Sequence, residues 1–410
     1  MSTHTEEPLP HRSKRRRLAD SEYESELAIP SNHDDLSSDS DAQPSEPSRK
    51  THEDEGSSIP PDDEDLFLSE VHIDPSNGPA RTHGESLRLT KFRINVPRGY
   101  HGDIPPFLQT GDPAYICIEH EMATPLRAVG LQVWMGALVL ADYVLSRYKH
   151  IKPVESAKRK GGVGSDAEAA DDEILFTSQT TVLELGCGAG LLAALCGKLC
   201  RTVYATDVCD DLAAEDRGDD VGVLRLCQRN MVKNHVDSVL RVRRLDLRDE
   251  ECPKLGSNVE AITSQEVPQQ SNGGSFVDFR WRPSEISDFQ QNCTIILAAD
   301  LIYDDAVTFA FLQRLPALLH PCPTAESKHP KSKQLLLALE KRVVFSLRDQ
   351  NVAAPARDYL LATLDAMNAD REERGLSDVV RYEEIDVDAI PQWFEYRRNE
   401  YLEMWRFWIE

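Results

Sequence analysis

The feature that most constrains the fold is a glycine-rich turn between an apolar strand and an apolar helix. Residues 182–190 read Val-Leu-Glu-Leu-Gly-Cys-Gly-Ala-Gly, and an apolar helical segment follows over 191–199. Glycine allows a backbone to turn tightly and allows another group to approach it closely. A strand that passes through such a turn into a helix is typical of a βαβ unit, so a parallel sheet is expected.

Short apolar strands and helices keep alternating after this turn. We predict strands over 180–185, 202–206, 239–245, 293–299, 334–339, 379–385 and 401–409. Further helices are predicted over 221–235, 307–319 and 356–368. This alternation predicts an α/β fold in which helices cover both faces of a mainly parallel sheet.

A smaller β-rich extension, residues 66–128, is expected before this domain, which spans 129–410. Residues 87–94 alternate apolar and polar side chains as a half-buried strand does, and 115–118 are its expected partner. Residues 129–148 have apolar side chains at helical spacing and predict a helix whose periodicity places Trp134 in the core. Polar segments over 152–173 and 248–290 predict two loop insertions.

The first 65 residues differ in composition from the rest. They carry 18 acidic and 7 basic residues and a single aromatic residue, Tyr23. Such a segment cannot bury enough apolar surface to offset its chain entropy, so we predict a disordered acidic tail. The basic run Lys14–Arg17 within it fits either a nuclear import signal or a charge run in a solvated tail.

Charge and cysteine content restrict the partners. A net charge of −24 argues against nucleic acid or an anionic membrane, and favours a basic protein partner. The longest uncharged apolar run, 185–197, is shorter than the roughly 20 residues of a membrane span. The first ten residues lack the apolar core of a secretory signal. The nine cysteines include no CxxC pair, so neither a disulfide framework nor a metal site is expected.

The glycine-rich turn also contains the first candidate binding residues, because ligands of such sheets bind beyond the carboxyl ends of the strands. Glu184, Gly186, Gly188 and Gly190 follow an ExGxGxG spacing. A dinucleotide-binding turn needs GxGxxG, but position 191 is Leu. The observed form is that of sheets that bind S-adenosylmethionine, whose ammonium group an acid can attract. A glycine-rich turn of another α/β protein is the alternative.

Other candidates close the next three predicted strands. Asp207 could accept hydrogen bonds from both hydroxyls of a ribose, and Asp246 could flank an adenine. Asp300 and Tyr303 place a carboxylate and a phenol at the mouth of the fourth strand, where they could orient and enclose an amine. For each Asp, a turn or helix-cap role is the alternative, and Tyr303 could be a core residue. Methylation of a base amino group typically uses (N/D)PP(Y/F/W), whose prolines are absent here.

Together these motifs resemble methyltransferase family 16, the seven-strand protein-lysine methyltransferases. The similar parts are the glycine-rich turn, the segment with Trp134, Ala-Thr-Asp-Val at 205–208, and Ala-Ala-Asp-Leu-Ile-Tyr-Asp-Asp at 298–305. The resemblance covers roughly 85–410 apart from the two loops. It implies a Rossmann-like seven-stranded fold that binds S-adenosylmethionine. The implied cofactor contacts are Trp134, Glu184, Gly186, Gly188, Gly190, Asp207, Asp246, Trp281 and Ala299, and the implied catalytic residues are Asp300 and Tyr303.

The expected function is that of an S-adenosylmethionine-dependent protein-lysine N-methyltransferase. It would transfer a methyl group in line to a lysine amine of a non-histone protein with a basic or lysine-containing surface. We expect a monomer of the nucleus and cytoplasm, with neither nucleic acid nor membrane as partner. Two alternatives stay open: methylation of a small molecule or RNA, and a non-catalytic scaffold that binds basic proteins. The glycine spacing disfavours a nicotinamide oxidoreductase.

Overall fold

A seven-stranded sheet forms the centre of the structure, a computed structural model that describes residues 66–68, 87–151, 176–208, 222–249, 278–321, 332–346 and 351–409. The strand order is β12-β13-β9-β8-β5-β6-β7. Strands β5 to β9 are parallel, and β13 lies antiparallel between β9 and β12. The strands are β5 (Thr181–Leu185), β6 (Thr202–Asp207), β7 (Leu240–Arg244), β8 (Cys293–Ala299), β9 (Gln334–Glu340), β12 (Val380–Ile385) and β13 (Leu402–Ile409). The predicted mainly parallel α/β sheet is therefore confirmed.

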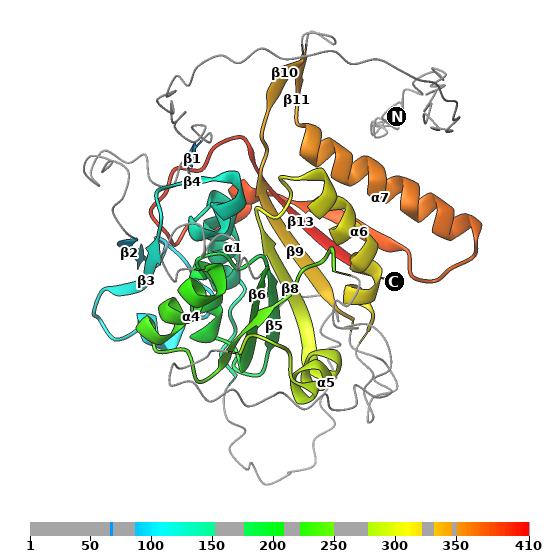
Figure 1. Cartoon of the computed structure of the whole chain (residues 1–410). Coiled ribbons are helices and arrows are strands. Elements are labelled where there is room, and N and C mark those ends of the chain that lie inside the picture. Colours follow the sequence, from blue (N-terminus) through cyan, green and yellow to red (C-terminus); the bar gives the residue numbers. More distant parts are fainter. Residues whose placement is uncertain are drawn as a thin grey trace, which may run out of the picture. The chain divides into compact units, whose positions relative to one another are not determined.

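Helices cover both faces of this sheet (Figure 1). One layer contains α1 (Met135–Ser146), α2 (Leu191–Gly197) and α4 (Val223–Lys233), and the other contains α5 (Pro283–Asn292), α6 (Asp305–Leu319) and α7 (Pro355–Glu373). Successive strand residues point to opposite layers: Val182 belongs to the core with α1 and α2, and Leu183 to the core with α6 and α7. This is why the strands read as uninterrupted apolar runs in the sequence.

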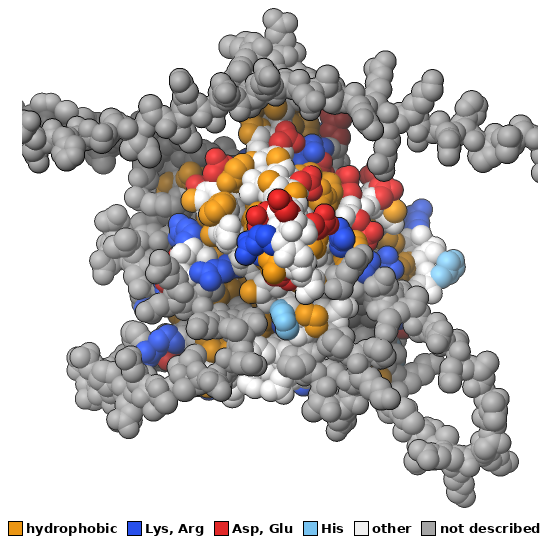
Figure 2. All heavy atoms as spheres, turned by 90° about the vertical axis from the view of Figure 1, so that its right-hand side faces the viewer, with side chains coloured by type: hydrophobic (Ala, Val, Ile, Leu, Met, Phe, Trp, Pro, Cys, Tyr) orange, Lys and Arg blue, Asp and Glu red, His pale blue; other side chains and the backbone are white. Residues whose placement is uncertain are grey.

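The surface outside these layers is charged. On the face that Figure 2 shows, acidic and basic side chains are interspersed with apolar ones. Among the described residues, no helix combines the length and the apolar character that crossing a bilayer requires.

A β-rich region precedes the central sheet, as predicted. Strand β2 (Arg88–Ile94) pairs antiparallel with β3 (Ala114–His120), and β1 (Leu66–Leu68) pairs with β4 (Ala123–Pro125). Asn230 of α4 joins this region to the glycine-rich turn, because its amide accepts from the Glu119 N–H and donates to the Ala189 carbonyl. The described residues all belong to one unit, Asp62–Glu410, and the predicted boundaries after 65 and 128 stay predictions. The tail and the 152–173 loop lie outside the described residues.

The structure corrects two predicted elements. The helix predicted over 129–148 begins only at Met135, after a 3-10 segment (Leu126–Leu131), and Trp134 has an extended backbone. Of the loop predicted over 248–290, residues 250–277 lie outside the described part of the chain, and its last residues belong to helix α5. The first turn of α5 contains Pro283, and its Glu285 accepts from the Arg282 N–H at 3.0 Å. This proline and capping box are helix-start signals that the polar composition obscured.

The remaining short elements are the 3-10 turns Pro106–Leu108 and Val387–Ala389 and the hairpin of β10 (Val344–Ser346) with β11 (Asn351–Ala353).

Candidate functional site

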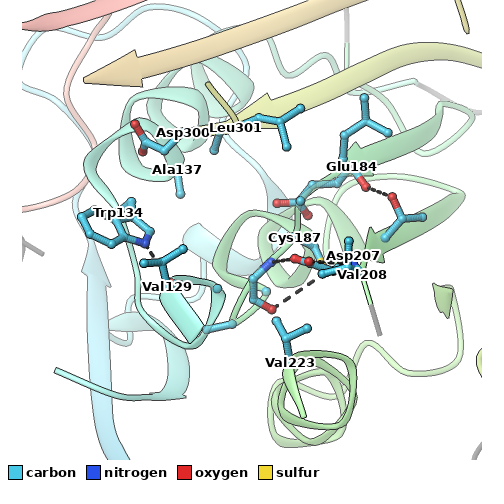
Figure 3. A pocket seen from close by; sticks show the side chains of 18 of the residues that line it. Val129, Trp134, Ala137, Glu184, Cys187, Asp207, Val208, Val223, Asp300 and Leu301 are labelled. Carbon is cyan, nitrogen blue, oxygen red and sulfur yellow. Dashed lines mark hydrogen bonds between the residues drawn. The ribbon is translucent and has the colours of Figure 1, made fainter. Parts of the chain in front are cut away.

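A pocket lies at the carboxyl ends of the parallel strands, where the strand order reverses around β5. Strands β6 and β7 extend the sheet on one side of β5, and β8 and β9 extend it on the other. Such a reversal opens a crevice that is the usual ligand site of these sheets. The walls come from 128–134, the glycine-rich turn, 206–208, 245–248 and 299–303, with a few residues of α1, α4 and α6. Figure 3 shows Trp134, Glu184, Asp207 and Asp300 around it.

The three glycines of the turn have conformations that other residues rarely adopt. Gly186, Gly188 and Gly190 have φ of 66°, 51° and 86°. A Cβ on Gly188 would lie 2.9 Å from the Gly130 carbonyl oxygen, and one on Gly190 would lie 2.8 Å from the Cys227 Sγ. Space as well as backbone geometry therefore requires glycine at both positions.

Asp207 holds this turn in place. Its Oδ2 accepts from the Gly188 N–H at 2.8 Å, and its Oδ1 accepts from the Val208 N–H at 2.8 Å. The carboxylate at the end of β6 therefore fixes the backbone of the motif on β5. It lines the pocket where a ribose was predicted to bind.

Glu184 is a buried acid with no ion-pair partner among the described residues. Its residue is 2% exposed, and its Oε2 has no hydrogen-bond partner among the described residues. Burial and the nearby Asp207 raise the pKa of Glu184 well above its usual value, against the smaller effect of the Ala193 N–H. An acid in this state at the pocket wall fits a ligand that brings a positive charge or hydrogen-bond donor.

Most ionisable side chains that line the described pocket are acidic. Its walls include the carboxyl groups of Glu184, Asp207, Asp246 and Asp300, and one guanidinium, Arg248. Arg248 is paired with Asp246 at 2.9 Å, and this hydrogen-bonded pair lowers the pKa of Asp246. The described pocket therefore favours a cationic ligand and disfavours a pyrophosphate.

Asp300 connects the pocket to helix α1 and strand β9 through two hydrogen bonds. Its Oδ2 accepts from the Gly136 N–H at 2.7 Å, in the first turn of α1, and its Oδ1 accepts from the Glu340 N–H at 2.9 Å. A Cβ on Gly136 would lie 2.5 Å from that Oδ2, so α1 can approach Asp300 only with glycine there. Burial raises the pKa of Asp300 to about 6, and its φ is 49°.

Trp134 and Tyr303 form the outer walls. The Trp134 indole donates to the Val129 carbonyl at 2.9 Å, and the Arg342 guanidinium lies 5.4 Å from the centroid of its ring. Tyr303 is 37% exposed at the mouth of the pocket. The structure thus brings together ten of the eleven predicted site residues, including Ala299 at the end of β8.

Trp281 is the exception, and its predicted position near a bound adenine stays a prediction. Its ring stacks on Tyr204 at 5.2 Å between centroids, and its indole donates to the Arg244 carbonyl at 3.0 Å. It does not line the pocket. Instead it packs with Phe289 of α5 over one face of the sheet.

Sequence reasoning missed Gly136 and Arg248. A glycine inside an apolar helical segment was a usable signal, because glycine is unfavourable there unless space requires it. Arg248 follows Asp246 by two residues, a spacing that permits a local ion pair. In the described residues, no group of three or more His, Cys, Asp or Glu is arranged to hold a metal ion.

The chain is 34% identical over 302 residues to human methyltransferase-like protein 22, matching 72% of this chain and 58% of that protein. This chain is similar to methyltransferase-like protein 22. The mouse methyltransferase-like protein 22 is 33% identical over 72% of this chain and 59% of its own length. The predicted resemblance to methyltransferases is thereby confirmed, and the chain spans less than two thirds of the length of these relatives.

No family model matches the chain. Among solved structures, the N-methyltransferase NodS from Bradyrhizobium japonicum, in complex with S-adenosyl-L-homocysteine, is 12% identical over 56% of this chain and 78% of that chain, with a TM-score of 0.27. An rRNA methylase from Streptococcus thermophilus is 8% identical over 57% of this chain and 89% of that chain, with a TM-score of 0.28. The strand order described above, and not this likeness, defines the fold class.

Proposed function

We propose that this chain is an S-adenosylmethionine-dependent protein-lysine N-methyltransferase that acts on a non-histone protein. The observation that carries the proposal is the unpartnered carboxyl oxygen of Glu184, buried in an acidic pocket beside the glycine-rich turn. A ligand with a sulfonium and an ammonium group suits this pocket, whereas a dinucleotide does not. The similarity to methyltransferase-like protein 22 supports the same reaction class.

The pocket residues fit this cofactor part by part. Glu184 would hold the ammonium of the methionine moiety, and the turn from Gly186 to Gly190 would allow its close approach. Asp207 would accept from the ribose hydroxyls, and Asp246 would lie beside the adenine. Trp134 would form the wall next to the methionine part. When bound, the cofactor supplies an electrophilic methyl group on a sulfonium.

The protein's own contribution to the transfer is alignment and proton handling. A lysine ammonium must lose a proton before its nitrogen can attack a methyl group. Asp300 would orient the amine and accept this proton, since its pKa of about 6 is nearer to neutral pH than that of an ordinary carboxyl group. Tyr303 would shape the channel. Most of the acceleration would come from in-line positioning, which can contribute several kcal/mol.

Charge supports a basic protein as the acceptor. The chain has a net charge of −24, and an acidic surface steers basic partners toward itself. We therefore propose a partner with a basic or lysine-containing surface, and neither nucleic acid nor membrane. We also propose a monomer that acts in the nucleus and cytoplasm, where Lys14–Arg17 would serve import. That run lies outside the described residues.

The test has two steps. Isothermal titration with S-adenosylmethionine and with NAD should show binding of the first only. Transfer of a radiolabelled methyl group into cell-extract proteins, followed by hydrolysis, should then give methylated lysine. Label confined to small molecules or RNA would overturn the lysine acceptor, and binding without transfer would favour the scaffold alternative. Absence of S-adenosylmethionine binding by folded protein would refute the proposal.

A further inference from the structure

The hairpin of β10 and β11 exposes apolar side chains next to the pocket. Val343, Val344 and Phe345 are consecutive and are 37%, 50% and 61% exposed, and Val352 opposite Phe345 is 57% exposed. Figure 1 shows the hairpin extending away from the central sheet. A run of three exposed apolar residues is unusual on a solvated surface and typically marks a site of interaction.

The base of this hairpin is fixed firmly to the catalytic end of the sheet. The Lys341 N–H donates to the Tyr401 carbonyl at 2.7 Å, and the Lys341 ammonium pairs with Glu403 at 2.8 Å. Glu340, the residue before Lys341, donates its N–H to Asp300. Arg342, the residue after Lys341, lies over the ring of Trp134, which lines the pocket. The hairpin therefore begins at the pocket rim.

We infer that the β10–β11 hairpin is the docking arm for the protein substrate, and that it binds an extended segment on one side of the acceptor lysine. This inference rests on the proposed function. Because the hairpin begins beside Trp134 at the pocket rim, a segment that lies along it would extend toward Asp300 and Tyr303. A bound segment would bury the exposed valines and Phe345, and removal of this apolar surface from water would stabilise the complex.

The geometry also limits the sequence of that segment. Phe345 follows Arg342 at the rim by three residues, which is about 10 Å of extended chain. A substrate in an extended conformation would therefore meet Phe345 about three residues from the position that lies beside Arg342. Asp304 and Asp305, which directly follow Tyr303, are exposed. They favour a segment with basic rather than acidic neighbours of the lysine.

The experiment compares the double variant Val344→Thr/Phe345→Thr with wild type. Threonine retains a high strand propensity, so the hairpin should still form. Leu376→Thr is the matched control, because Leu376 is 40% exposed after the end of α7. The acceptor is whole-cell protein extract freed of small molecules, and the readout is the initial rate of radiolabelled methyl transfer against extract concentration, with the S-adenosylmethionine Kd measured in parallel.

The double variant should lower the slope of rate against extract concentration at least about tenfold, a loss that corresponds to about 1.4 kcal/mol. Its cofactor Kd should equal that of wild type, and Leu376→Thr should match wild type in both. Phe345→Leu, which keeps apolar area, should retain most of the slope. A wild-type slope in the double variant would overturn the docking arm alone. Absence of transfer by wild type would instead overturn the proposed function, and the docking arm with it.

Discussion

Replacement of Glu184 by Gln tests whether the carboxylate of Glu184 binds a positively charged group of the cofactor. The change nearly preserves the shape of the side chain but removes its ability to ionise. In the free protein, burial and Asp207 raise the pKa of Glu184 because they disfavour its charged form. A bound cation next to the carboxylate does the opposite. Binding of S-adenosylmethionine should therefore lower this pKa and release a proton from Glu184.

The sign and size of the effect follow from this linkage. Between the lowered pKa of Glu184 in the complex and its higher pKa in the free protein, the affinity should rise about tenfold per pH unit as pH increases, with up to one proton released per bound cofactor. Above that pKa the dependence should disappear. At such a pH, Glu184→Gln loses a hydrogen bond to a charged group, worth about 1.5–3 kcal/mol, so the Kd should rise roughly 10- to 150-fold.

Isothermal titration in two buffers of different ionisation enthalpy measures this proton release directly. Wild type and Glu184→Gln are compared at several pH values, so that protons released by the cofactor itself cancel. Glu285→Gln is the control, because Glu285 is a buried acid, 8% exposed, that pairs with Arg243 outside the pocket. Equal proton release and equal Kd in wild type and Glu184→Gln would refute the assignment of Glu184 as the partner of a cation.

Three further variants test the frame around the pocket. Gly136→Ala places a methyl group 2.5 Å from the Asp300 Oδ2, so both melting temperature and methyl transfer should fall, and wild-type values would contradict this packing. Because the pKa of Asp300 is raised to about 6, the folded protein binds more protons than the unfolded chain, and wild type should lose stability as pH rises from about 4 to 6. Asp300→Asn should lack that component in pH-dependent denaturation, and an unchanged profile would exclude Asp300 as its source. Trp281→Ala should lower the free energy of unfolding by about 2 kcal/mol or more without changing the cofactor Kd, and a weaker Kd would restore Trp281 to the site.

The sequence predicted the strands well because each is buried on both faces and therefore reads as a bounded apolar run. Strand β8 has the predicted bounds, and β5, β6 and β9 differ by a residue. The helix before the sheet was harder to predict. Its apolar periodicity continues through Leu131 and Trp134, but the backbone there is a 3-10 turn followed by an extended residue. Hydrophobic spacing indicates which residues are buried, but not whether their backbone is helical. Trp134 is partly buried because it lies at the pocket wall, before the first residue of α1.

The candidate site was predictable to the level of residue types at strand ends, but the partners were not. Asp300 and Gly136 are 164 positions apart, and nothing in the local sequence of either indicates the hydrogen bond between them. Trp281 is a second case. The family resemblance implied an adenine contact for it, whereas its ring stacks on Tyr204 and lies edge-on to Phe289 of α5. Tertiary packing, and not the local sequence pattern, determines the partners of both Asp300 and Trp281.

The hydrogen bonds of the pocket also determine which variants can report on chemistry. Asp207 and Asp300 each accept two backbone N–H groups, so they hold the glycine-rich turn and the start of α1 in place. Loss of activity after their replacement would be expected from a disturbed frame as much as from a lost contact with substrate. Glu184 differs, because its Oε2 has no hydrogen-bond partner in the part of the chain that the structure describes. A change in ligand affinity at Glu184, with an unchanged fold, therefore isolates recognition of the ligand from support of the pocket.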